Sequence, residues 1–334
     1  MCRLPRNSIE EPCSTAAGVS GPAFTCEKLN STTFVLEEHD RWSENPLIYA
    51  KVLPETIILI DTGCGGSKQT PGIEGTLKDF LENTPVKANN SRPLNHGATR
   101  QYTVICTHCH YDHIGGISEF ADDSQTTIWA SALGRSIIEN PTRLSSASLC
   151  RFVGIATPKY AVTNWAEDRD CLSNVGSPGS GLVVYQTPGH TPDQVAIWDP
   201  TERHLFVGDT CYEDAPILFP NGGNILQYGQ SIQKLRGLVR GWDRYDNLGT
   251  DDRAKLPHRV KIASGHNTRN ADAEELLSKV DNFLAKVSSG EVEGEDITTC
   301  NYAWAGGEPA VEFRERGSDL YFQGLRSVFS KLLD

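Results

Sequence analysis

Short apolar runs rich in β-branched residues recur along the chain and predict buried strands. They lie at residues 33–36, 47–53, 56–60, 102–106, 127–129, 182–185, 194–198, 204–207 and 260–263. Apolar residues with a helical period predict helices near 73–81, 117–121, 132–139 and 225–239, and an amphipathic helix at 271–287. Strands therefore dominate the prediction from about residue 30 onward.

The remaining segments define the expected domain organisation. Residues 1–30 mix Pro, Ser and Gly without periodicity, which predicts either a poorly ordered N-terminal arm or a segment that wraps an edge of the fold. Residues 31–334 are expected to form one large domain, because a layered core is attainable at this length. The stretch at about 140–181 is expected to be an irregular insertion, either a lid or a solvated surface loop. Residues 290–334 either cap the pocket or pair with another subunit, as in a homodimer.

The stretch 107–116 places three imidazoles and a carboxylate directly after a predicted strand. Alternate residues of an extended chain point the same way, so His108 and His110 can bind one ion together. The chain then curls, which lets Asp112 and His113 face a second position beside the first. Two adjacent metal ions are the expected occupants of this stretch.

Three later strands also end in a glycine followed by a potential ligand, namely His190, Asp209 and His266, and Asp61 follows the 56–60 strand. Ligands delivered from strand ends can converge on one edge of a sheet sandwich. Taken singly, each residue has a plainer interpretation as a turn or surface side chain. Their recurrence favours one shared site.

Cysteines suggest no second chemistry. The Cys106-x-x-Cys109 pair is compatible with a redox or zinc pair, but strand alternation favours two small buried apolar side chains. The ten cysteines are spread along the chain without the compact spacing of small secreted scaffolds, so we expect mainly free thiols.

Charge and hydropathy exclude several partners. The chain has 31 basic and 43 acidic residues, a net charge of −12, and no basic cluster, which disfavours nucleic acid. No apolar stretch approaches the roughly 20 residues that span a bilayer, and the N-terminus lacks the apolar core of a signal peptide. We expect a cytoplasmic protein that acts on a small molecule, with no membrane partner.

These motifs, in their order along residues 33–287, resemble the metallo-β-lactamase superfamily. The matching segments are Asp61-Thr62-Gly63, the stretch 107–116, Gly189-His190-Thr191, Gly208-Asp209-Thr210 and Gly265-His266. The resemblance implies an α/β fold, the αββα four-layer metallo-β-lactamase sandwich, with two metals at one edge. The sequence departs from the family at Asp193, where a glycine is usual, and this change affects no implied ligand.

The resemblance also implies a ligand set. One metal would be bound by His108, His110 and His190, the other by Asp112, His113 and His266, and Asp209 would bridge them. Asp61 would orient a ligand rather than bind. Two Zn²⁺ ions are the default, because imidazole and carboxylate suit zinc, but iron or manganese could occupy the same ligands.

A hydroxide shared by two cations would attack a carbonyl, so no serine or cysteine nucleophile is needed, and Asp112 is a candidate to relay a proton to the leaving group. Asp209 aligns the site with lactone hydrolases, hydroxyacyl-glutathione hydrolases and polyketide-releasing thioesterases. Tyr212 has the spacing at which lactone hydrolases of the family carry a tyrosine, which can donate to the developing oxyanion. Its plainer interpretation is packing at a loop start.

We therefore predict a dinuclear zinc hydrolase that opens the ring of a lactam or lactone in a small, aromatic compound. Similar fungal enzymes open cyclic amides and carbamates made by plants, such as benzoxazolinones, which would make the role xenobiotic detoxification. A thioesterase is the alternative. A mononuclear iron oxidoreductase acting on persulfides and a non-catalytic binding module are weaker hypotheses. Tyr212, Phe219 and Trp304 are candidates for the wall of an apolar pocket, although aromatics more often lie in a core.

Overall fold

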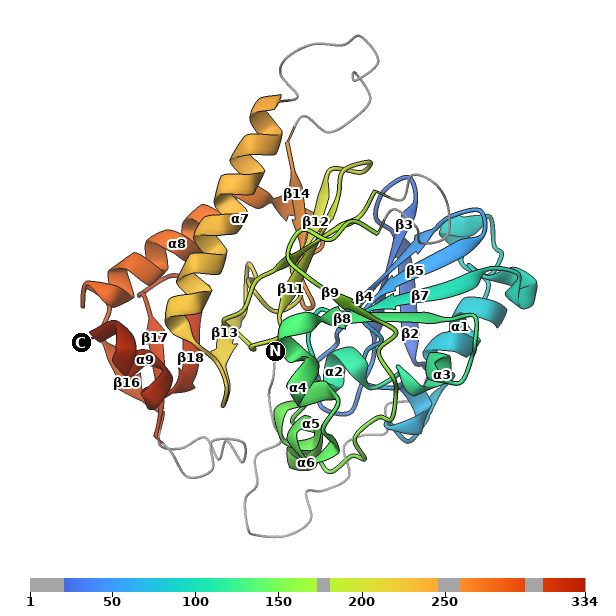
Figure 1. Cartoon of the computed structure of the whole chain (residues 1–334), viewed down its shortest axis with the longest axis horizontal. Coiled ribbons are helices and arrows are strands. Elements are labelled where there is room, and N and C mark those ends of the chain that lie inside the picture. The colour runs from blue at the N-terminus through green and yellow to red at the C-terminus, as the bar shows by residue number, and fades with distance from the viewer. Residues whose placement is uncertain (1–20, 173–180, 246–258, 298–308, 334) are drawn as a thin grey trace. The chain divides into compact units, whose positions relative to one another are not determined.

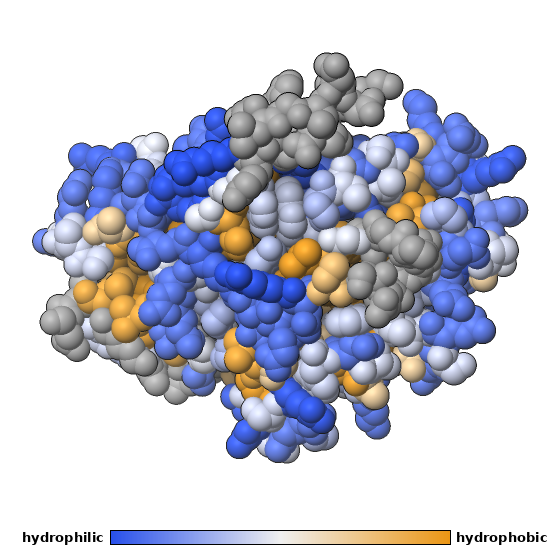
Figure 2. Space-filling view, turned by 45° about the horizontal axis from the view of Figure 1, so that its top comes forward, coloured by the Kyte–Doolittle hydropathy of each residue, from blue (hydrophilic) through white to orange (hydrophobic). Residues whose placement is uncertain are grey.

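The computed structural model describes residues 21–172, 181–245, 259–297 and 309–333 (Figure 1). They form two compact units. The first contains residues up to Ala166, and the second contains most of the chain from Glu167 onward. Among the described residues no helix is long and apolar enough to cross a bilayer. On the face shown in Figure 2, hydrophilic residues predominate and hydrophobic ones form small patches.

The first unit is built on a seven-stranded sheet whose central strand, β5 (Thr56–Ile60), is fully buried. In spatial order the strands of this sheet are β2 (Phe24–Lys28), β3 (Thr33–Glu38), β4 (Leu47–Val52), β5, β7 (Gln101–Ile105), β8 (Thr127–Ser131) and β9 (Asn164–Ala166). Pairing is antiparallel from β2 to β5 and parallel from β5 to β9. The continuous apolar run of β5 fits its burial, since strands covered on both faces carry no polar alternation.

Short helices connect the parallel strands of this unit. They are α1 (Leu77–Asn83), α2 (Tyr111–Ile114), α3 (Ser118–Ala121), α4 (Arg135–Ile138), α5 (Pro141–Ala147) and α6 (Cys150–Val153). A small parallel pair, β1 (Gly21–Pro22) with β6 (Ile73–Glu74), completes it. The predicted irregular stretch 140–181 thus contains α5, α6 and β9. Asn140 caps α5 by accepting from the N–H groups of Thr142 and Arg143, so the expectation of irregular structure there was wrong in part.

The second unit contains two sheets and three helices among the described residues. The five-stranded sheet has the order β10 (Val183–Gln186), β11 (Val195–Asp199), β12 (His204–Phe206), β14 (Lys261–Ala263) and β15 (Ala271–Asp272). The four-stranded sheet has the order β13 (Pro216–Phe219), β18 (Tyr321–Leu325), β17 (Ala310–Arg314) and β16 (Gly294–Asp296). Helix α7 (Ile225–Tyr245) packs against α8 (Ala273–Ser288) and α9 (Arg326–Leu333).

The chain termini were less predictable than its centre. Strand β2 lies inside the predicted arm and forms an edge of the seven-stranded sheet, so edge wrapping is the alternative that holds for residues 21–30. The predictions for residues 1–20 lie outside the described residues. The four-stranded sheet was not predicted, because a proline begins β13 and polar residues interrupt the apolar positions of β17 and β18.

Candidate metal centre

The first unit delivers four potential ligands, His108, His110, Asp112 and His113, which we call the first half-site. Strand β7 runs parallel to β5 with Ile105 beside Ile60, so the residues that follow both strands emerge at the same edge of the sheet. The chain then enters α2 at Tyr111. All four side chains are at most 1% exposed, although histidine and aspartate rarely lie so deep unless they are paired or bind a metal.

The ligand atoms of the first half-site lie close together in two pairs. His108 Nε2 is 2.9 Å from His110 Nδ1, and His113 Nε2 is 3.5 Å from an Asp112 carboxylate oxygen. Two nitrogens that bind one zinc ion at about 2.0–2.1 Å are separated by roughly 3 Å. The histidine pair therefore has the spacing of two ligands of one ion.

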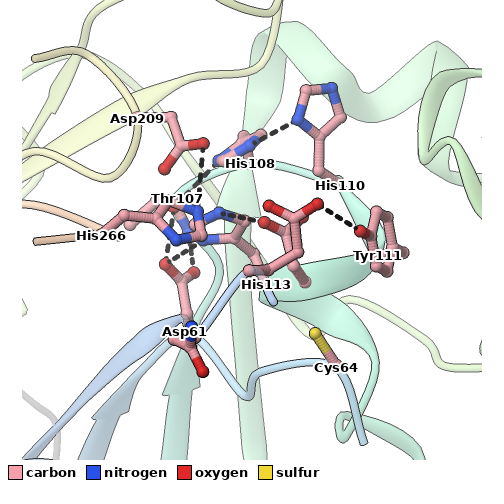
Figure 3. A network of polar contacts seen from close by, with 12 residues as sticks. Asp61, Cys64, Thr107, His108, His110, Tyr111, His113, Asp209 and His266 are labelled. Carbon is pink, nitrogen blue, oxygen red and sulfur yellow. Dashed lines mark hydrogen bonds and ion pairs between the residues drawn. The ribbon is translucent and has the colours of Figure 1, made fainter. Parts of the chain in front are cut away.

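Asp61 supports the first half-site through hydrogen bonds to Thr107 and His113, as Figure 3 shows. One carboxylate oxygen accepts from His113 Nδ1 at 2.8 Å and from the Thr107 hydroxyl at 2.8 Å, and the other accepts from the Thr107 backbone N–H at 2.7 Å. The bond to Nδ1 directs His113 Nε2 toward Asp112. A carboxylate behind an imidazole is the usual support of a metal-binding histidine. The predicted orienting role of Asp61 agrees with this contact.

The turn after β5 lies directly against the C-terminal end of α2 because residue 115 is a glycine. The backbone N–H of Gly115 donates to Gly63, and the N–H and hydroxyl of Thr62 both donate to the carbonyl of His113. A Cβ at Gly115 would lie 2.2 Å from the Cys64 carbonyl oxygen. The approach of these two segments thus requires glycine, and it fixes His113 relative to Asp61.

The second unit delivers Asp209, His190 and His266, which we call the second half-site. Strands β12 and β14 are parallel, and Phe206 lies beside Ala263. Asp209 and His266 lie three residues beyond these two paired residues, so both emerge at the same edge of the sheet. One Asp209 oxygen is 3.6 Å from His266 Nε2 and 3.7 Å from His190 Nε2. The carboxylate therefore faces both imidazoles, as a bridging ligand would.

His190 is oriented by the backbone around it. Its Nδ1 lies 2.6 Å from the carbonyl oxygen of Leu218, to which it can donate, and this directs Nε2 toward Asp209. The preceding Gly189 has φ of +152°, and a Cβ there would lie 2.4 Å from Tyr228 Cα. Tyr228 in turn donates its phenol hydrogen to the Thr210 carbonyl at 2.7 Å. The start of α7 thus holds both the His190 loop and the Asp209 loop.

The donor chemistry of both half-sites fits divalent metal ions. Imidazole and carboxylate are borderline to hard ligands that suit zinc, iron and manganese. In His113 and His190 an oxygen engages Nδ1, which leaves Nε2 as the coordinating nitrogen. Asp209 has ligand atoms within 4.8 Å of both His190 and His266, as have His108 and His110 of one another. The division of ligands between two ions remains a prediction.

The other predicted residues lie in mixed surroundings. Tyr212 is 2% exposed, and its ring meets the His266 ring edge-on at 5.8 Å between centroids. Phe219 packs in an aromatic core with Tyr228, Phe322 and Phe329, so for this residue the core is the alternative that holds. Trp304 lies outside the described residues.

Two buried carboxylates near the first half-site were not predicted. Glu38 accepts from the N–H groups of Cys64 and Gly66 in the turn after Asp61, and Glu44 accepts from the Tyr111 hydroxyl. Burial raises the pKa of Glu38 to about 8, and the two N–H bonds oppose that rise. For Glu38 the only local signal was its position at the end of an apolar strand, where a charged residue is ordinarily exposed to solvent. Cys106 and Cys109 are buried in the apolar core, as predicted.

Comparisons with known proteins place these features in a family. A model described as metallo-beta-lactamase superfamily matches residues 47–247. A protein of Aspergillus versicolor named as a putative transcription factor is 30% identical over 81% of this chain and 78% of its own length. An acyl-coenzyme A thioesterase of Gallus gallus is 27% identical over 63% of this chain and 71% of its own length.

Solved structures share the fold. A metallo-beta-lactamase family protein from Thermus thermophilus matches with a TM-score of 0.56 and 15% identity, over 78% of this chain and 82% of that one. A metallo-beta-lactamase from Pontibacter korlensis matches with a TM-score of 0.51 and 19% identity, over 78% of this chain and 99% of that one.

Proposed function

Because the chain belongs to the metallo-beta-lactamase superfamily, whose members are metal-dependent hydrolases, we propose that its two half-sites form one dinuclear centre that hydrolyses an acyl bond. The observation that carries the proposal is the seven buried ligands, each half of the set already grouped within its own unit. The family match includes the first half-site together with His190 and Asp209, which supports their joint use.

Seven residues would hold the metals, with zinc expected. They are His108, His110, Asp112, His113, His190, Asp209 and His266. Two bound cations supply Lewis acidity, which lowers the pKa of water toward neutrality and polarises a carbonyl. Asp61 and the Leu218 carbonyl hold two of the imidazoles in orientation, so little reorganisation is needed when ions bind.

Two residues of the chain have roles beyond metal binding. Asp112 can hold a proton and pass it to the leaving group, since it is a buried carboxylate beside His113. Tyr212 can donate its phenol hydrogen to an oxyanion that develops beside His266. The edge-on contact of these two rings favours a place for Tyr212 next to the reacting carbonyl.

The substrate we propose is a small cyclic amide or ester, opened to a carboxylic acid and an amine or alcohol. The position of Tyr212 supports this choice, because a tyrosine at this spacing is the feature that resembles lactone hydrolases. An aromatic, xenobiotic compound remains the expected substrate class, and a cytoplasmic setting the expected location.

A thioester is the second candidate, and the relatives favour it. Proteins named acyl-coenzyme A thioesterase match in chicken, cattle and human, the human one at 26% identity over 70% of this chain. A hydroxyacylglutathione hydrolase of Idiomarina loihiensis is 32% identical over 41% of this chain. The chemistry of attack is the same in both candidates, and only the leaving atom differs.

A substrate panel separates the candidates. Purified protein loaded with zinc is incubated with lactams, lactones and acyl thioesters, and product masses are recorded. A ring-opened product, heavier than its parent by one water, supports the first candidate, whereas free thiol supports the second. Tyr212→Phe should slow ring opening by about two orders of magnitude, the lower end of the roughly 100- to 1,000-fold cost of losing an oxyanion donor. An unchanged rate in Tyr212→Phe would remove its proposed role.

A further inference from the structure

The β3–β4 connection comprises residues 38–46 and begins with the last residue of β3. It is partly buried, because Asp40, Trp42 and Glu44 lie inside whereas Arg41 and Ser43 are exposed. Asp40 organises it by accepting from the backbone N–H groups of Trp42, Glu44 and Asn45 at 2.6, 3.3 and 2.7 Å. Two of its residues, Ser43 and Asn45, have left-handed backbone angles. Internal bonds of this kind hold the loop in one shape.

Glu38 extends from the start of this connection to the turn that carries Asp61. Its two carboxylate oxygens accept from the N–H groups of Cys64 and Gly66 at 2.6 and 2.7 Å, and the side chain is fully buried. Gly63 makes room for it, since a Cβ there would lie 1.9 Å from a Glu38 oxygen. The two hydrogen bonds of the Glu38 carboxyl group therefore fix the turn between Asp61 and Gly66.

Glu44 extends from the far end of the same connection to the metal-ligand helix α2. Its carboxylate accepts from the Tyr111 hydroxyl at 2.8 Å, and the Trp42 ring meets the Tyr111 ring edge-on at 5.3 Å. Tyr111 stands between His110 and Asp112 in sequence, and it is fully buried. Fixing this side chain fixes the backbone from which the two ligands project.

We propose that the β3–β4 connection is a positioning element for the metal ligands, in which Glu38 sets the turn bearing Asp61 and Glu44 sets Tyr111 in α2. The proposal rests on the dinuclear site of the proposed function. It assigns to residues 38–46 the task of holding both sides of the first half-site before metal arrives. Neither glutamate belongs to the ligand set, so both are positioning residues rather than catalytic ones.

Tyr111→Phe tests the helix side with a matched control elsewhere in the same unit. Tyr102 is also buried, and its hydroxyl donates to Glu82 at 3.1 Å, but it lies in β7 away from the ligands. Each substitution removes one phenol–carboxylate bond and keeps the ring. The full-length protein, freed of metal, is titrated with zinc against a chromophoric chelator, and its unfolding temperature is measured in parallel.

We expect Tyr111→Phe to weaken zinc binding by about tenfold, at the lower end of the 10- to 100-fold typical of residues that support metal ligands. Tyr102→Phe should lower the unfolding temperature of the metal-free protein about as much as Tyr111→Phe does. Its zinc affinity should equal that of the wild type. Glu44→Gln should keep near wild-type affinity, because its amide oxygen can still accept from Tyr111, whereas Glu44→Leu should match Tyr111→Phe.

Glu38→Gln tests the turn side. The amide keeps one acceptor and presents an NH₂ to the second backbone N–H, so we expect a loss of zinc affinity of about 10- to 100-fold. Visible absorption of the Co²⁺-loaded protein should change in the same variant. Equal zinc affinity in wild type, Tyr111→Phe and Glu38→Gln would overturn the positioning role alone. A wild-type chain that binds no zinc would overturn the proposed function and the positioning role together.

Discussion

Asp61→Asn is the most informative single perturbation of the first half-site, because it alters a tautomer without altering a ligand. Asp61 adopts φ of +64°, a left-handed conformation that asparagine tolerates as well as aspartate, so the backbone should be retained. The amide oxygen can replace the acceptor of the Thr107 N–H. The NH₂ group then faces Thr107 Oγ1 and His113 Nδ1.

The threonine hydroxyl can rotate to accept from that NH₂, but the imidazole must change its tautomer. If His113 Nδ1 becomes the acceptor, its proton moves to Nε2, the nitrogen that faces Asp112. A protonated Nε2 cannot bind a metal. The loss is one hydrogen bond to a charged group, worth about 1.5–3 kcal/mol, which is roughly 10- to 150-fold in affinity.

The assay is zinc competition with stoichiometry read by elemental analysis. We expect two zinc ions per wild-type chain. In Asp61→Asn, we expect weaker binding of the ion assigned to Asp112, His113 and His266. Asp199→Asn is a matched control, since Asp199 is buried and accepts from the backbone and hydroxyl of Thr201, at the end of β11 remote from the His190 loop. Wild-type zinc affinity for both ions in Asp61→Asn would refute the argument from tautomers.

Three further outcomes are expected. Gly189→Ala should lower the free energy of unfolding by about 1–3 kcal/mol in urea, because its Cβ would meet the Tyr228 backbone, whereas Gly237→Ala in α7, where nothing lies within 4 Å, should raise it. Burial lowers the pKa of His204 to about 4, whereas the same imidazole in the unfolded chain is protonated below about pH 6.5. The free energy of unfolding of the metal-free protein should therefore fall by up to about 3 kcal/mol as the pH is lowered from 6.5 to 4. Urea unfolding across that pH range should show a smaller fall in the free energy of unfolding for His204→Phe than for the wild type. An identical fall would show that His204 is not the group responsible. Chelator treatment should abolish hydrolysis and added zinc restore it, while His110→Ala and Asp209→Ala should stay inactive with zinc and retain wild-type circular dichroism.

Much of the candidate ligand set could be predicted because its signals are local. The stretch His108–His113 carries four candidate ligands in six residues, and each later candidate follows a strand and a glycine. The fold class, α/β of the metallo-β-lactamase type, was predicted from the same motifs and is confirmed by the family match and the solved structures. Each of the nine strands predicted from an apolar, β-branched run overlaps a strand of the structure.

The supporting structure could not be predicted, because it depends on contacts between distant residues. Glu44 and Tyr111 are far apart in sequence, and an isolated glutamate in a polar segment predicts solvent exposure. Strand β13 pairs with β18 across about a hundred residues, and it begins with Pro216, which usually argues against a strand. Helices α5 and α6 are too short for a helical period to stand out.

The parallel register of β12 and β14 has a consequence for how the protein acquires metal during its synthesis. The first half-site offers only two candidate ligands to each ion once the first unit has folded, so a cation bound at that stage would be held weakly. His266 reaches Asp209 only after helix α7 has been made and β14 has docked beside β12. Tight retention of both cations would therefore mark a fully translated chain, and a product arrested before β14 should release its metal readily.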